Sequence, residues 1–93
     1  MTIQDEIKYV KVQLVSKSES RDRFTKLRGL MWEIKEGFYK SANFTQAEAL
    51  AELKSYDRLI KSYTEELCDL HLRLQYLEQM LRQPVQFAEA IAV

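Results

Sequence analysis

The chain has 93 residues, of which 46% are hydrophobic and 30% are charged, and its 14 Lys and Arg balance its 14 Asp and Glu. This composition is that of a foldable chain rather than a disordered one, and the zero net charge argues against a purely electrostatic binder of nucleic acid or membranes. One cysteine excludes an internal disulfide, and no apolar run approaches the roughly 18 residues of a membrane-spanning helix. The acidic start, residues 1–6, does not have the pattern of a signal peptide, so we expect a cytoplasmic protein without a membrane partner.

A first helix is predicted over about residues 3–40. It begins near Thr2, with Asp5 and Glu6 in its first turn, where carboxylates favour the positive end of the helix dipole. Its apolar residues form two stripes that are offset by three residues from one heptad repeat. The stripes are Ile3, Ile7, Val10, Leu14 and Phe24, Leu27, Met31, Ile34, Phe38. Three serines lie at the offset, within residues 16–20, and serine weakens a helix interior, so we expect either a break there, which we favour, or a locally overwound helix.

Two glycines, Gly29 and Gly37, lie within these apolar helical patterns. Each is less favourable than alanine in a helix interior by about 1 kcal/mol. We therefore expect a close helix crossing or a slight bend near them, and neither belongs to a Gly-rich phosphate loop.

A turn is predicted at residues 41–45, and such short connections give antiparallel neighbouring helices. The stretch from Gly37 to Ala47 resembles the inter-helix turn of a tetratricopeptide repeat, with an aromatic pair before the turn and an aromatic and then an alanine after it. That repeat has a period of about 34 residues. No second copy occurs in the sequence, so we interpret the likeness as convergent hairpin chemistry.

A second helix is predicted over about residues 46–83, between a capping box formed by Thr45 and Glu48 and the helix-ending Pro84. Apolar residues recur along it through five heptads without a charge at either seam position. This seam consists of Leu53, Tyr56, Ile60, Tyr63, Leu67, Leu70, Leu74, Leu77 and Leu81, preceded by Ala49. At 1.5 Å per residue the helix is about 55 Å long. The sequence therefore predicts a single all-α domain, a long antiparallel helical hairpin that resembles a coiled coil.

Both helices carry more apolar residues than one seam uses. The surplus is Cys68, Leu72, Tyr76 and Met80 in the second helix and Leu30, Trp32 and Tyr39 in the first. Leaving such side chains exposed forgoes about 1.5–3 kcal/mol each. We therefore expect a homodimer, with C2 symmetry the simplest choice, in which two hairpins form a four-helix bundle and the seam serves the oligomer.

Trp32 and Tyr39 lie seven residues apart and are predicted to share a helix face outside the seam. Aromatic residues with arginine nearby are common in binding hot spots, so these two are candidates for contact with a partner. The alternative is that both pack inside the dimer core.

Residues 8–28 form a basic segment, in which basic residues outnumber acidic ones by five. Its candidates for contact with phosphate or an acidic partner are Lys17, Arg21, Arg23, Lys26 and Arg28. The alternative is a solvated face with internal ion pairs, such as one between Glu19 and Arg23 at helical spacing.

Cys68 and His71 are three residues apart on the predicted helix and form half of a metal site at most. The Glu-x-x-His pairs of di-iron bundles are missing. A nucleophilic cysteine needs a neighbouring base in a concave setting, which an all-helical hairpin with one histidine does not offer. We therefore expect no catalytic residues, no metal and no cofactor.

The apolar tail, residues 84–93, is expected to fold back on the bundle as a short helix. Alternatively, its end from Ile91 to Val93 resembles a PDZ-type carboxylate ligand or an apolar degradation tag.

From these features the sequence predicts a non-enzymatic protein-interaction module: an adaptor, a small assembly chaperone or a steric inhibitor of a larger complex. Its small size would suit a phage-encoded regulator. The alternative is a nucleic-acid-associated regulator that uses the basic segment.

Overall fold

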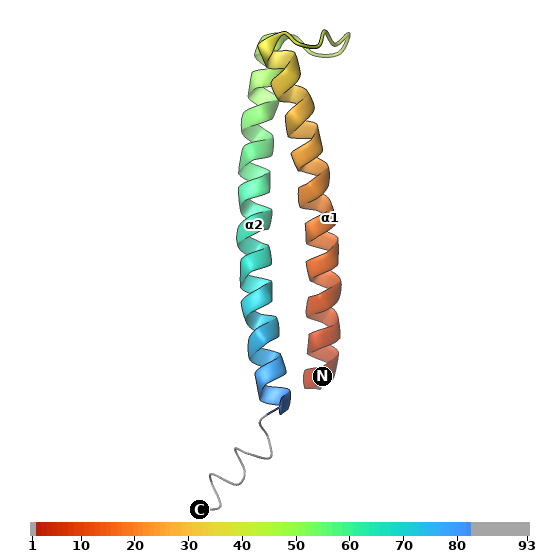
Figure 1. Ribbon diagram of the computed structural model, residues 1–93, viewed down its shortest axis with the longest axis vertical. Coiled ribbons are helices and arrows are strands. Elements are labelled where there is room, and N and C mark those ends of the chain that lie inside the picture. The colour runs from red at the N-terminus through yellow and green to blue at the C-terminus, as the bar shows by residue number, and fades with distance from the viewer. Residues whose placement is uncertain (1, 83–93) are drawn as a thin grey trace, which may run out of the picture.

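A computed structural model describes residues 2–82, which form two long helices packed side by side as an antiparallel hairpin (Figure 1). Helix α1 spans Ile3–Glu36 and helix α2 spans Gln46–Arg82. The predicted all-α class and the helical hairpin are confirmed. Neither of these two helices has an apolar stretch that could cross a bilayer. The predicted tail, residues 84–93, lies outside the described residues.

Helix α1 begins where the sequence predicts and ends earlier. The Thr2 hydroxyl accepts a hydrogen bond from the Asp5 amide at 3.1 Å, and the Asp5 carboxylate accepts one from the Thr2 amide, which completes a capping box. At the other end, Gly37 has a φ of +83°, in the left-handed region that favours glycine, and its amide donates to the Ile34 carbonyl. The prediction that Gly37 lies inside a helix was wrong, because this glycine caps α1 and ends it at Glu36.

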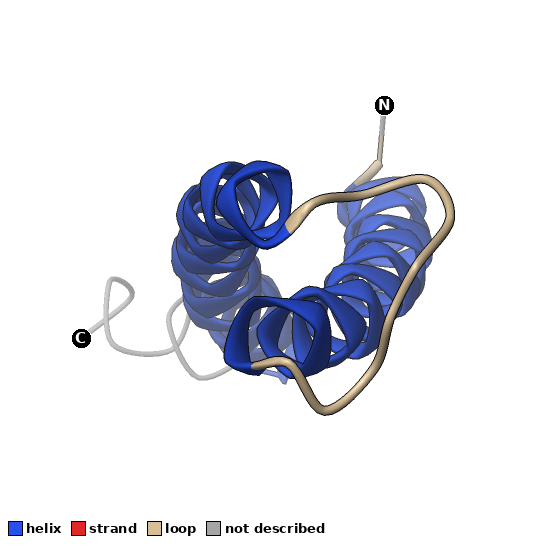
Figure 2. Cartoon of the chain, turned by 90° about the horizontal axis from the view of Figure 1, so that it is seen from above, coloured by secondary structure: helices blue, strands red, loops and turns tan. Residues whose placement is uncertain are grey.

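The connection covers residues 37–45 and follows a wide arc beside the helix ends (Figure 2). Its end is the capping box predicted from the sequence: the Glu48 amide donates to the Thr45 hydroxyl at 3.1 Å, and the Thr45 amide donates to the Glu48 carboxylate at 3.2 Å. The Gln46 amide side chain donates to the Lys35 carbonyl at 3.3 Å. These bonds satisfy backbone groups at the start of α2 and at the end of α1, and so fix the two helices to each other at the turn.

Helix α1 is continuous through residues 16–20, so the favoured break was wrong. The reason lies in one column of the heptad repeat that runs through the offset: Ile3, Val10, Lys17, Phe24 and Met31 recur at intervals of seven. The buried face of α1 uses Ile7 and Leu14 beside this column in its first half and Leu27 and Ile34 in its second half. The change of stripe is thus a rotation of the buried face around an unbroken helix.

The apolar core is divided into two clusters. The turn cluster lies next to the connection and contains Met31, Ile34, Ala49 and Leu53, with Phe44 and Tyr56 packed against it. The terminal cluster lies near the chain ends and contains Ile7, Val10 and Leu77, with Ile3, Leu14, Leu70 and Leu74 packed against it. The predicted seam of α2 therefore faces α1 of the same chain, and only its last member, Leu81, is largely exposed, at 43%.

Between the clusters lies a polar and aromatic waist. The Phe24 ring lies 5.7 Å from the Tyr56 ring and 5.9 Å from the Tyr63 ring. Lys17, which occupies a core position of the heptad column, donates a 2.7 Å hydrogen bond to Glu66, and this bond raises the pKa of the Lys17 ammonium. Arg28 forms an ion pair with Asp57. The waist therefore joins the helices through aromatic contacts, charge pairs and the buried Leu67, whereas the clusters join them through aliphatic burial.

Gly29 lies on the exposed side of α1. A Cβ atom built at this glycine would meet nothing within 4 Å, so no close helix crossing occurs at Gly29, whereas a Cβ atom at Gly37 would lie 3.1 Å from the Gln46 side-chain nitrogen.

Candidate interaction surfaces

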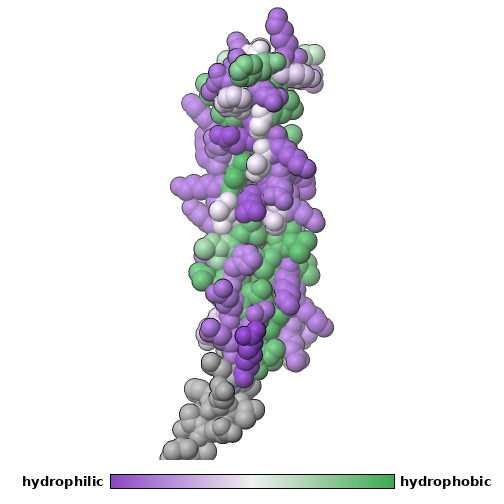
Figure 3. Space-filling model, viewed as in Figure 1, coloured by the Kyte–Doolittle hydropathy of each residue, from purple (hydrophilic) through white to green (hydrophobic). Residues whose placement is uncertain are grey.

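A hairpin of two helices is one layer thick, and its cross-section measures only 19 × 17 Å. No large side chain among residues 2–82 is fully buried, and 13 large apolar side chains are exposed. They are Tyr9, Val12, Val15, Leu30, Trp32, Phe38, Tyr39, Leu50, Leu59, Leu72, Tyr76, Met80 and Leu81. None of them falls in residues 16–29 or 60–71, which form the waist. The surface view shows the same division, with apolar atoms gathered at the turn and over the lower half of the rod (Figure 3).

The hairpin has two open faces, one on each side of the line where the helices meet. One face contains a groove of about 530 Å³ whose lining includes Ser18 and Arg21 from α1 and Thr64 and His71 from α2. The opposite face contains a hollow of about 340 Å³ lined by Glu6, Tyr9, Val10, Leu70 and Arg73. In α2, whose buried positions keep a heptad repeat, residues seven apart from these lining residues share their faces. In α1 the buried face rotates, so the column of Arg21 is buried at Ile7 and reaches the groove face only from Arg21 onward, and the column of Glu6 is buried at Ile34.

The groove face is basic. We call it the basic face and define it by the columns of heptad spacing that contain Ser18, Arg21, His71 and Cys68. Seven basic residues in these columns outnumber two acidic ones, Asp57 and Glu78, by five. The basic residues are Lys11, Arg21, Arg28, Lys35, Lys54, Lys61 and Arg82. The zero net charge of the chain therefore conceals a strongly basic surface built from both helices.

The opposite face is more apolar and nearly neutral. We call it the Tyr9 face and define it by the columns that contain Glu6, Tyr9 and Arg73. Four of the exposed large apolar side chains lie in these columns: Tyr9, Leu30, Leu59 and Met80. The charged members are Glu6, Glu52, Glu66, Arg23 and Arg73, which leave one net negative charge. Within the face, Arg73 contacts Glu6 at 3.3 Å.

The basic segment of α1 does not form one patch. Lys17 and Arg28 are paired with α2 carboxylates, and Arg21 lies 3.8 Å from Asp22. Within residues 2–82, no carboxylate lies within ion-pair distance of Arg23 or Lys26, and these two lie outside the columns of the basic face. Charge counted along the sequence did not identify Lys54 and Lys61, which lie on the same face of the hairpin as Arg21 and Arg28. Their spacing from Cys68 in multiples of seven residues is the signal that identifies them.

Trp32 and Tyr39 do not share a helix face, because α1 ends at Glu36 and Tyr39 lies in the connection. Trp32 packs instead against Phe38, with 5.7 Å between ring centroids. Trp32 is 41% exposed and Phe38 is 75% exposed. The turn therefore carries an exposed aromatic pair that differs from the predicted one by one residue.

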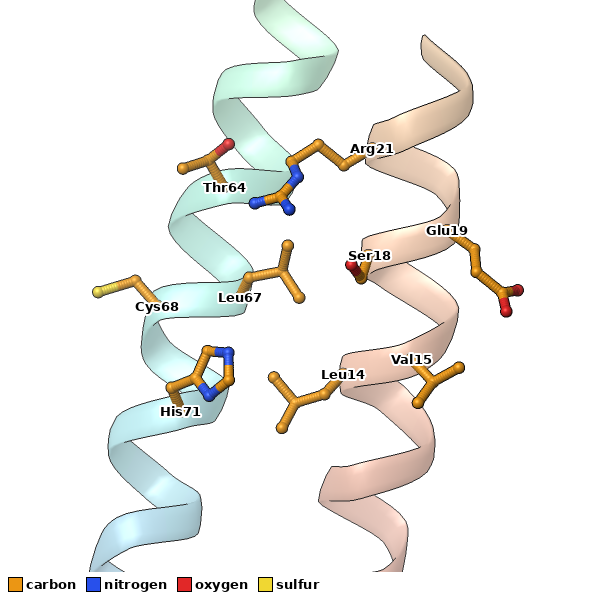
Figure 4. Close-up of a pocket in the computed structure, with 9 residues that line it drawn as sticks. All are labelled: Leu14, Val15, Ser18, Glu19, Arg21, Thr64, Leu67, Cys68 and His71. Carbon is orange, nitrogen blue, oxygen red and sulfur yellow. The ribbon is translucent and has the colours of Figure 1, made fainter. Parts of the chain in front are cut away.

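The groove does not assemble reactive groups. Leu14 and Leu67 point toward each other across it, and Arg21 extends from α1 toward α2 (Figure 4). His71 is directed into the space between the helices, whereas Cys68 points away from α1. The described residues contain no group of three His, Cys, Asp or Glu side chains that could hold a metal. The groove is thus an apolar depression whose lining includes one basic residue, Arg21, and one acidic residue, Glu19.

Comparisons of the chain with models of known protein families, with curated proteins and with solved structures found no match. The surfaces are therefore interpreted from their own chemistry.

Proposed function

We propose that this chain is a non-enzymatic protein-interaction module of the cytoplasm that self-associates, as a homodimer, into a four-helix bundle and uses its remaining surface to hold another protein or protein complex. An adaptor, a small assembly chaperone and a steric inhibitor all fit this description. The observation that carries the proposal is the set of 13 exposed large apolar side chains on the hairpin formed by residues 2–82.

The size of the hydrophobic effect supports self-association. Covering one such side chain contributes about 1.5–3 kcal/mol, and contiguous exposed apolar surface is typical of interaction sites. The exposed residues lie on both helices and, for Phe38 and Tyr39, in the connection. Those on the helices cannot turn inward together, because each helix already buries one stripe against the other. A second hairpin supplies the missing layer without a different gene product.

Light scattering of the purified chain tests the proposal. We expect a mass of twice the 11.0 kDa of one chain at micromolar concentration, retained at high salt because apolar burial dominates the contact. A stable monomer that binds no apolar dye would contradict it, since the exposed side chains would then need no cover.

The second candidate function, association with nucleic acid, is favoured by the excess of five positive charges on the basic face. Phosphate contacts make affinity fall steeply with salt. We expect the double variant Lys54→Ala/Lys61→Ala to weaken binding to a DNA or RNA duplex. The control Arg23→Ala/Lys26→Ala removes the same charge outside the basic face and should leave binding unchanged. A binding constant that does not respond to salt would exclude this mechanism.

A further inference from the structure

We propose that a second copy of this chain packs on the Tyr9 face in one particular arrangement: the two-fold axis crosses the waist at right angles to the helices, so that α1 lies antiparallel to α1 of the second copy and α2 to its α2. The inference rests on the self-association proposed above and specifies its face, symmetry and register.

The choice of face follows from charge and apolar content. If two basic faces packed together, each would bring an excess of five positive charges into the contact. Like charges in a contact are strongly unfavourable. The Tyr9 face has one net negative charge and carries the exposed apolar column members Tyr9, Leu30, Leu59 and Met80. Of the two faces, the Tyr9 face therefore buries more apolar surface in a dimer and causes less charge repulsion.

The position of the second copy along the helices follows from pairing opposite charges with each other and apolar side chains with each other. Within the hairpin, Lys17 contacts Glu66, which fixes which residues of the two helices lie at one level. A two-fold axis level with residues 19–20 of α1 and 62–63 of α2, on the turn side of the Lys17 and Glu66 contact, sets Tyr9 opposite Leu30 of the second copy. The same axis sets Glu52 opposite Arg73 of the second copy. The midpoints of these two pairs fall at the same level to within about two residues, or roughly 3 Å, which the long Glu52 and Arg73 side chains can span.

The other two-fold arrangement, with the axis parallel to the helices, is disfavoured. It opposes residues of equal level, so that Leu30 faces Glu52 of the second copy and Arg23 faces its Leu59. Each of these contacts desolvates a charge against an apolar side chain without a partner. The crossing axis avoids both contacts; it sets Glu66 opposite Leu59 of the second copy, but Glu66 already has a partner in Lys17 of its own chain. The crossing axis also places the small side chains of Ser16 and Ser20, which share the Tyr9 face, beside the axis, where the two α1 helices approach each other.

The face is large enough. Helix α2 has 37 residues and is therefore about 55 Å long at 1.5 Å per residue, and the rod is 17–19 Å wide, so full overlap covers roughly 1,000 Å² of each copy. Stable protein interfaces bury about 800 Å² per partner. Overlap over only one end of the rod would fall short of this area, so the contact must include the waist.

Cysteine cross-linking at two neighbouring serines tests the arrangement. In a Cys68→Ser background, Ser20→Cys places a thiol near the axis on the Tyr9 face, whereas Ser18→Cys places one on the basic face, where Ser18 lines the groove. With a short bismaleimide, we expect Ser20→Cys to form covalent dimers and Ser18→Cys to remain without a covalent cross-link, although both variants still associate. Dimers of Ser18→Cys alone would overturn the inference. If light scattering shows dimers but Ser20→Cys does not cross-link, this arrangement fails while self-association stands; a monomeric mass removes both.

A charge exchange tests the register independently. Glu52→Arg opposes like charges across the axis twice, and we expect it to raise the dimer dissociation constant about tenfold or more. Adding Arg73→Glu to the same chain restores the opposite-charge pairs and should return the dissociation constant to near its original value. Lys61→Glu, on the basic face, is the control and should leave it unchanged. Failure of the double variant to recover, with helix content by circular dichroism intact, would contradict the Glu52 and Arg73 pairing.

Discussion

The turn cluster and the terminal cluster are built from similar aliphatic residues, yet they are held in different ways. The turn cluster joins segments that are close in the sequence, and it is enclosed by the Gly37 cap, the Thr45 capping box and the bond from Gln46 to the Lys35 carbonyl. The terminal cluster joins the two ends of the described chain, with no connection beside it.

This difference indicates how the hairpin holds together. The turn half can form first because closing a short loop costs little conformational entropy. The helices can then pair progressively from the turn toward the terminal half. The terminal half also has exposed apolar side chains outside its cluster, among them Tyr9, Tyr76 and Met80. The turn half has nearly as many, so it is the missing connection that should make the terminal half gain most from the proposed second copy.

The largest expected effects come from truncating each cluster. Met31→Ala should lower the free energy of unfolding of the whole hairpin by about 2–5 kcal/mol, because the terminal half has no connection of its own to hold its two helices together. Leu77→Ala should act mainly on the terminal half, where amide protection falls while the turn half stays protected. Hydrogen exchange measured residue by residue checks both. Equal loss of protection along the rod in Leu77→Ala would show that the two halves are one cooperative unit.

Two glycine substitutions, one within α1 and one at its end, should change the free energy of unfolding in opposite directions. Gly29→Ala should raise the free energy of unfolding by about 0.5–1 kcal/mol, since the added Cβ meets nothing within 4 Å. Gly37→Ala should lower it by about 1 kcal/mol, because the φ of +83° is unfavourable for alanine. Chemical denaturation of both variants measures the difference. A destabilising Gly29→Ala would mean that a partner approaches α1 at that glycine.

The waist that separates the clusters should contribute little through its ion pairs. Arg28 and Asp57 are both about half exposed, and exposed pairs contribute about 0.2–1 kcal/mol. A double-mutant cycle with Arg28→Ala and Asp57→Ala should give a coupling energy in this range that decreases as salt is added. A much larger, salt-insensitive coupling would indicate that the pair is buried in the assembled protein.

The smallest effect is expected at alkaline pH. Burial, with the nearby Glu52 second, raises the pKa of Tyr56, and the hydrogen bond to Glu66 raises the pKa of Lys17. Both groups hold their protons more tightly in the folded chain, so their contribution is complete below the ordinary pKa values of 10.0 and 10.5 and is lost as the pH rises beyond them. Urea denaturation should show this decline, and Tyr56→Phe should reduce it. A stability that increases over the same range would reverse the assigned sign.

The sequence was sufficient for the features that depend on one helix at a time. The heptad repeat from Ala49 to Leu81 and the box of Thr45 and Glu48 are local patterns, and α2 follows both. The end of α1 was missed because Phe38 and Tyr39 continue an apolar pattern past Gly37, and periodicity does not distinguish a capping glycine from an interior one.

The surfaces could not be predicted in the same way because they depend on how the two helices are paired. Lys17 interrupts an otherwise apolar core column, and its contact with Glu66 from the other helix shows how a lysine is accommodated there. Likewise, the basic face joins Arg21 and Arg28 to Lys54 and Lys61, which are distant in the sequence. The charge on each face of a hairpin can be determined once it is known which residues of the two helices lie side by side.

Thermal unfolding at increasing protein concentration tests most directly whether a layer of two helices needs a second copy. Because only the folded chain associates, mass action requires the midpoint temperature to rise from low to high micromolar concentration. We expect this rise, together with a native mass of twice 11.0 kDa. A midpoint that does not change with concentration, measured on a chain of monomeric mass, would contradict it and would show that the exposed apolar residues are stable in water.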